Sequence, residues 1–143
     1  MDGVPLVGVD LSSAFLQGVR LKKANLVRAN LDGADARDAD LEWAQMEDAS
    51  LRSTNLRGAK LTGASLRGSA MDGADLSGAD LNSADVGGTS LEDADLHGAD
   101  LRGMKWSGLR SVKGANVYGV KSAPGGFVEW MVGHGAVVKK EQE

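Results

Sequence analysis

An apolar residue recurs at every fifth position from Leu6 to Trp106 without a single insertion. Of these 21 positions, 16 are leucine, and 14 of the residues two places before them are alanine. Neither regular secondary structure has this period, because an α-helix turns by about 100° per residue and a strand alternates its faces. A chain that turns a corner within every five residues keeps both apolar columns inside. The period therefore predicts a solenoid.

The tandem A-[DN]-L-x-x units, such as those at 24–28 and 94–98, resemble the repeats of pentapeptide-repeat proteins over about residues 4–108. The resemblance implies an all-β fold, a right-handed quadrilateral parallel β-helix of about five to six coils, stacked at about 4.8 Å. We expect leucine to fill the interior and alanine to lie beside the corner. The polar residue between them should point to water, and the glycine column two residues after the leucine favours a positive φ.

The period is lost after Trp106 and resumes one residue out of phase at Ala115, which predicts one more imperfect coil with a bulge. We assign the β-helix to residues 1–122, with regular repeats at 4–108 and the out-of-phase coil at 109–122. Residues 123–143 form a C-terminal segment and tail, in which the helical spacing of Phe127, Trp130 and Met131 favours a short helix. Two interpretations stay open: a cap over the last coil, which solenoids require, or a homodimer contact, which some family members imply.

The residue types argue against catalysis. The chain has no cysteine, and its two histidines, His97 and His134, lack partners at metal-ligand spacing. No phosphate-binding or nucleophile motif is present. We therefore predict no catalytic, cofactor or metal site, and we do not expect an enzyme. No Lys/Arg cluster favours direct nucleic-acid binding and no apolar run approaches the ~18 residues of a membrane span, so we expect a soluble, cytoplasmic protein. The family resemblance implies a bacterial source.

Acidic residues concentrate in residues 71–106, which hold eight Asp and Glu against two Lys and Arg. In a coil of twenty residues Asp75 would stack on Asp95 and Asp80 on Asp100, with Asp85 around the corner. One interpretation is a surface that keeps the protein soluble. The family resemblance implies another: a surface that mimics duplex DNA and acts on DNA gyrase or topoisomerase IV, both type II topoisomerases.

Two aromatic residues lie at outward positions of the repeat, Phe15 and Trp43. Exposed aromatic side chains are typical of protein-binding hot spots, so the pair is a candidate interaction surface. The alternative for Trp43 is structural, with Lys23 of the preceding coil over its ring as a cation–π pair. The leading prediction for function is a non-enzymatic protein-interaction or scaffold module of the pentapeptide-repeat family.

Overall fold

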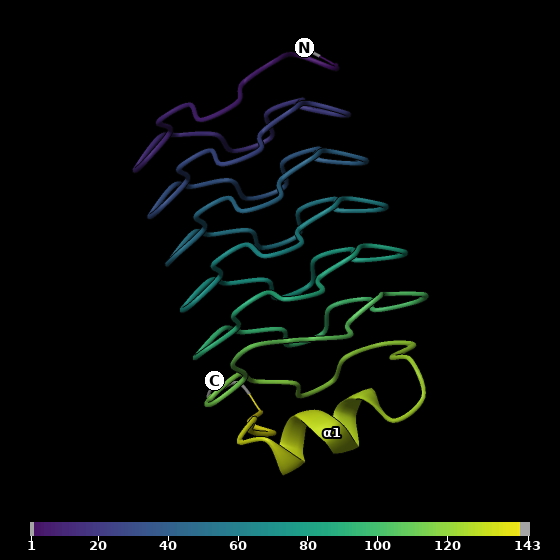
Figure 1. Ribbon diagram of the computed structural model, residues 1–143. Helices are drawn as coiled ribbons and strands as arrows, with labels where there is room; N and C mark the ends of the chain where they lie inside the picture. The colour runs from purple at the N-terminus through teal and green to yellow at the C-terminus, as the bar shows by residue number, and fades with distance from the viewer. Residues whose placement is uncertain (1, 141–143) are drawn as a thin grey trace.

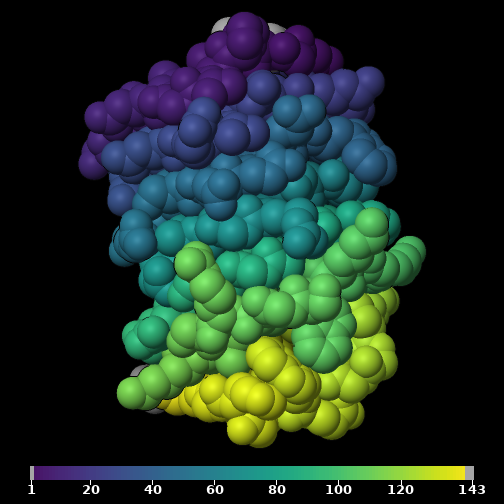
Figure 2. Space-filling view, viewed as in Figure 1, coloured from purple at the N-terminus to yellow at the C-terminus, as the bar shows by residue number. Residues whose placement is uncertain are grey.

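The computed structural model describes residues 2–140, which form a rod of stacked four-sided coils (Figure 1). Residues twenty positions apart lie side by side: one series of parallel bridges runs through Pro5, Asn25, Gln45, Ser65, Asp85 and Lys105. Three further series begin at Asp10, Phe15 and Arg20, one on each of the other sides. The period of five in the sequence thus becomes a period of twenty in space, and successive coils follow one another along the rod in Figure 2.

Each side is short, so the coils pair through isolated bridges and not through long strands. A tight turn separates the sides: the N–H of Val9 donates to the carbonyl oxygen of Leu6 at 3.2 Å, and the same bond recurs along the chain. The third residue of this turn has a positive φ, +66° at Gly8 and +65° at Gly63. A type II turn requires that conformation, and glycine adopts it without strain. The expectation for the glycine column is confirmed.

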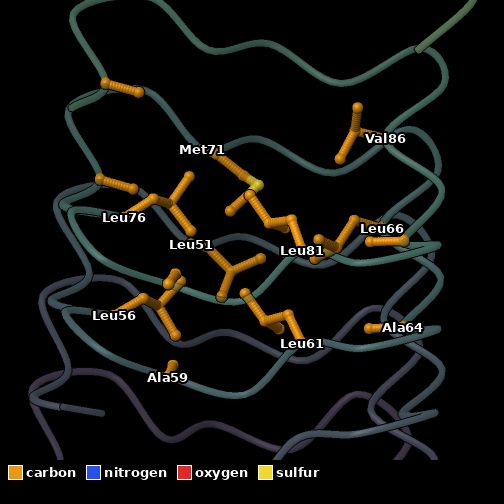
Figure 3. Packing of buried hydrophobic residues seen from close by; sticks show 14 of the residues in the cluster. Leu51, Leu56, Ala59, Leu61, Ala64, Leu66, Met71, Leu76, Leu81 and Val86 are labelled. Atoms are coloured by element: carbon orange, nitrogen blue, oxygen red, sulfur yellow. The ribbon is translucent and has the colours of Figure 1, made fainter. Parts of the chain in front are cut away.

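Leucines from the four sides meet on the axis of the rod, and Figure 3 shows them stacked from coil to coil. Leu26, Leu61 and the alanines at 59 and 64 are completely buried. Backbone bonds hold adjacent coils in register, as where the N–H of Leu26 donates to the carbonyl oxygen of Gln45 at 2.7 Å. Burial of each leucine thus depends on the coils above and below it, as is typical of solenoids.

The out-of-phase coil contains the expected bulge. Ser90 pairs with Ser111 at a spacing of 21 residues, so one residue is extra. Leu109 is buried while Arg110 is exposed, which identifies Arg110 as the residue pushed outward.

Helix α1 (Phe127–Gly133) is the only helix among residues 2–140, and it lies across the C-terminal end of the rod (Figure 1). The chain then returns to the last coil, where Val137 forms a parallel bridge with Asn116. Lys139 follows, and its N–H donates to Asn116 Oδ1 at 3.0 Å. The end of the described chain is therefore paired with the coil, a feature that the repeat pattern did not predict. The last residues of the predicted tail, 141–143, lie outside the described part.

Candidate interaction surfaces

The acidic residues have a structural role that the sequence analysis missed. Each accepts, through its Oδ1, a hydrogen bond from the backbone N–H two residues ahead, where it closes an Asx turn at the corner. The distances from these N–H groups are 3.0 Å to Asp75, 2.9 Å to Asp80, 3.0 Å to Asp85, 2.9 Å to Asp95 and 3.1 Å to Asp100. These side chains do not simply point to water: all five residues are half-buried.

The acidic rows are interrupted by cations. Asp75 bridges to Asp95 and Asp80 to Asp100, so the expected stacking is present. The second row continues to Lys60 on one side and Lys121 on the other. Arg57 approaches Asp75 at 4.0 Å and Arg67 approaches Asp85 at 3.2 Å. The negative surface is thus confined to a few coils and flanked by positive charge.

The end of the rod opposite α1 is formed by the N-terminal coil, residues 2–21. In later coils each bridge residue turns both backbone groups toward the preceding coil: the N–H of Asn25 donates to Val4 at 2.9 Å, and its carbonyl oxygen accepts from Leu6 at 2.7 Å. The equivalent groups of Pro5, Asp10, Phe15 and Arg20 therefore face outward along the rod axis. Within residues 2–140, no coil covers them (Figure 1).

The apolar side chains of this coil are also incompletely covered. Six of them are only half-buried, whereas their counterparts in later coils are fully buried: Val4, Leu6, Val9, Leu11, Leu16 and Val19. We call these side chains, together with the outward backbone groups of Pro5, Asp10, Phe15 and Arg20, the N-terminal face. Half-exposed core residues beside an unpaired backbone edge are typical of a surface that another chain covers.

Phe15 is the most exposed large apolar side chain of the described residues, at 94%. It occupies a column in which each later member up to Asn116 closes an Asx turn: Asp35, Asn55, Asp75, Asp95 and Asn116. Phenylalanine has no acceptor for this bond, so the corner at Gln17 lacks the hydrogen bond that the later Asp and Asn corners of this column have. Phe15 thus departs from the pattern of its own column and exposes its ring to water, which makes it a candidate contact residue.

Trp43 lies apart from Phe15, so the two aromatics do not form one surface. It belongs to the corner between the sides of Asp40 and Gln45, more than one coil further along. Its indole is 52% exposed and lies against Gly63 of the following coil, where an added Cβ would collide with the ring. The ring thus leans away from the coil of Lys23, which argues against the expected cation–π pair, and its contact with Gly63 is structural.

The C-terminal segment packs on the last coil through an aromatic cluster. Phe127 and Met131 are fully buried. The Trp106 ring meets Phe127 edge-on at a centroid distance of 5.4 Å and Trp130 at the same distance. Trp130 in turn stacks on His134 at 4.0 Å, and the two are also joined by a contact of 2.7 Å between His134 Nδ1 and the Trp130 carbonyl oxygen. These contacts cover the end of the core from within the chain.

Charge pairs near the N-terminal coil shift several protonation equilibria. A side-chain hydrogen bond from Ser12 lowers the pKa of Asp10, and its backbone bond adds to the effect. The guanidinium of Arg37 donates to Asp35 at 2.8 Å and lowers the pKa of that carboxyl group. Glu42, 3.0 Å from the Lys22 ammonium, raises the pKa of Lys22. These pairs remain partly open to solvent, so they adjust local charge and contribute little to stability.

The hollows of the surface are shallow and open to solvent. One of about 450 Å³ lies between Arg67, Lys105 and Trp106 near the C-terminal end. Another, of about 290 Å³, lies beside Arg57 and His97. His97 also meets Tyr118 edge-on at 5.3 Å. Within residues 2–140, no group of three or more His, Cys, Asp and Glu side chains is placed to hold a metal ion, and no helix has the length and apolar character needed to cross a membrane.

Comparison with solved structures identifies similar folds. A pentapeptide repeat protein from the thylakoid lumen of Arabidopsis thaliana aligns over 93% of this chain and 81% of its own length, with a TM-score of 0.55 at 20% identity. The protein Rfr23 from the cyanobacterium Cyanothece 51142 aligns over 72% of this chain and 63% of its own, with a TM-score of 0.48 at 31% identity. QnrB1, a plasmid-mediated fluoroquinolone resistance protein, aligns over 87% of this chain and 75% of its own, with a TM-score of 0.46 at 19% identity.

Comparison with protein families gives the clearest assignment. No curated protein matches the sequence. The family model "Pentapeptide repeats" matches eight copies in three segments, residues 6–42, 39–78 and 74–105, which together span most of the chain. The predicted family is thereby confirmed: the chain belongs to the pentapeptide repeat family.

Proposed function

We propose that the protein is a non-enzymatic protein-interaction module that binds its partner through the N-terminal face and the ring of Phe15. The observation that carries the proposal is the 94% exposure of Phe15 at a position where later coils place a turn-closing Asp or Asn. Aromatic side chains contribute much of the energy of protein interfaces. An exposed aromatic ring beside half-buried core residues supplies such an anchor.

The two ends of the rod differ, and the difference supports this assignment. We propose that α1 acts as the cap, since the side chains of Phe127 and Met131 are fully buried at the C-terminal end of the rod. The N-terminal face has no such cover among residues 2–140. The function of the rod is then to hold one coil edge rigidly in place for a partner.

Photo-crosslinking tests the proposal. Benzoylphenylalanine replaces Phe15 and keeps an aromatic ring there; in a control protein it replaces Val138, which is 57% exposed at the other end. We expect adducts in an extract of the source cells from position 15 and not from position 138. Excess wild-type protein should suppress them, and excess Phe15→Asn protein should not. Absence of adducts, or equal competition by both proteins, would refute the proposal.

A second candidate is a DNA-mimicking modulator of a type II topoisomerase. The observation in its favour is the stacking of Asp75 on Asp95 and of Asp80 on Asp100. The test is DNA supercoiling by purified gyrase, with and without a fluoroquinolone, in the presence of wild type or of a variant with these four residues changed to Asn. Asparagine keeps the Oδ1 that closes each Asx turn, so the variant removes charge and preserves the corner. An effect of wild type that the variant lacks supports this candidate; no effect of either excludes it.

A further inference from the structure

We propose that the N-terminal face binds a second copy of the same chain, so that two rods join head to head around a two-fold axis. The proposal rests on the interaction function argued above and specifies its partner. It uses the N-terminal end, whereas the homodimer expected from the sequence would use the C-terminal segment.

The backbone of the N-terminal face is suited to pairing with its own copy. Asp10, Phe15 and Arg20 each present an N–H and a carbonyl oxygen in the same direction, and Pro5 presents a carbonyl oxygen alone. Residues that exchange both bonds with one partner residue are the hydrogen-bonded pairs of an antiparallel ladder. Two coils related by a two-fold axis run in opposite directions at their contact, so their edges meet in this antiparallel sense.

The outline of the face also favours another coil as its partner. Its four bridge residues lie on four sides of one coil, so a single extended peptide reaches only one side. A second coil of the same cross-section reaches all four, as each coil inside the rod already does. Among these four residues Asp10 is negative and Arg20 is positive, so two copies meet without net repulsion.

The opposite end limits the assembly to a dimer. Head-to-tail stacking would need an open edge at the C-terminal end, but α1 lies across it and Val137 already pairs with Asn116. Among residues 2–140, only the N-terminal face remains for pairing between coils, and a contact between two identical faces closes after two subunits.

The size of the face sets the expected strength. One side of a coil is shorter than about 16 Å, the length of five extended residues at about 3.3 Å each, because a turn takes up part of every repeat. Two such faces bury less than the ~1,200 Å² at the lower end of stable interfaces. We therefore expect a reversible dimer whose population depends on protein concentration.

Sedimentation velocity over a concentration series tests the proposal with wild type, Phe15→Asn and Val138→Asn. Both variants remove one exposed apolar side chain, at opposite ends of the rod. We expect wild type and Val138→Asn to shift from monomer to dimer over the same concentration range, and Phe15→Asn to require at least about tenfold more protein, the ratio that 1.4 kcal/mol of interface energy produces. A dimer unaffected by Phe15→Asn would overturn the proposal.

Spin labels identify the end that forms the contact. The chain has no cysteine, so Ser12→Cys and Val138→Cys each give a single labelling site. Six bridge steps of about 4.8 Å separate Phe15 from Val137, so labels at Val138 should lie roughly 60 Å apart in the head-to-head dimer. Labels at Ser12 should lie much closer together. The reverse order would assign the dimer to the C-terminal segment and overturn the proposal.

The outcomes of these experiments distinguish the homodimer from the proposed protein-interaction function on which it rests. If the wild type stays monomeric at every concentration while position 15 crosslinks to another protein, the homodimer is refuted and the protein-interaction function is supported. A monomer without any adduct at position 15 overturns both.

Discussion

Replacing Phe15 by asparagine should stabilise the isolated rod. Asparagine already occupies this column at positions 55 and 116, where its Oδ1 accepts from the N–H two residues ahead at 3.2 Å and 3.1 Å. The corresponding bond to the Gln17 N–H is worth about 1 kcal/mol net. Phe15 is 94% exposed, so only about 12 of its ~200 Å² are buried. Losing the burial of this area costs ~0.3 kcal/mol at ~25 cal/mol per Å². The balance is a gain of about 0.5–1 kcal/mol.

Two measurements at a concentration that keeps the protein monomeric test this balance. Urea unfolding should show a higher midpoint for Phe15→Asn, and hydrogen exchange of the Gln17 amide should slow by roughly two- to fivefold, the factor equivalent to that energy. Phe15→Leu is the matched control: it keeps an exposed apolar side chain, adds no acceptor and should resemble wild type in both assays. A lower midpoint for Phe15→Asn, or an unchanged Gln17 amide, would refute the reasoning that Phe15 displaces a turn-closing residue.

Three further predictions concern the rod itself. Leu61→Ala removes a fully buried side chain that contacts coils on both sides and should cost about 2–5 kcal/mol in urea unfolding; a loss below about 1 kcal/mol would contradict the continuous core. Gly63→Ala places a Cβ against the Trp43 ring at a φ of +65° and should cost about 1–3 kcal/mol, part of which Trp43→Gly should restore in the double variant; simple additivity would disprove the contact. Asp35, whose pKa Arg37 holds below the usual 3.8, stabilises the fold above that pH, and the contribution is lost as the pH falls through the lowered value. Arg37→Gln should raise this pKa in a carboxyl-carbon NMR titration, and an unchanged pKa would contradict the pairing.

The architecture was predictable because one constraint is repeated many times. Any single Ala-x-Leu triplet fits several structures, but 21 five-residue units in strict register leave only a chain that turns every five residues. The burial of Leu26 and Leu61, the positive φ of the glycine column and the extra residue before Ser111 all follow from that register. Each is a local consequence of where a residue falls within the repeat.

The surface was less predictable, because it depends on how side chains orient. The Asp and Asn column was expected to point to water, although a turn-closing role was readable from its place three residues before the positive-φ position. The lean of Trp43 toward Gly63 and the return of Val137 to Asn116 depend on packing between distant segments, which no local pattern encodes. The open N-terminal face likewise emerges only once coil stacking fixes the direction of each N–H.

Hydrogen exchange at the N-terminal coil, followed as the protein is concentrated, tests the central claim most directly. The claim is that the outward N–H groups of Asp10, Phe15 and Arg20 form an edge that a partner coil completes. We predict that these three amides become protected as concentration rises, that amides of α1 do not change, and that Phe15→Asn abolishes the protection over the same range. Amides at the N-terminal coil that exchange equally fast at every concentration, or protection that appears in α1 instead, would contradict the account.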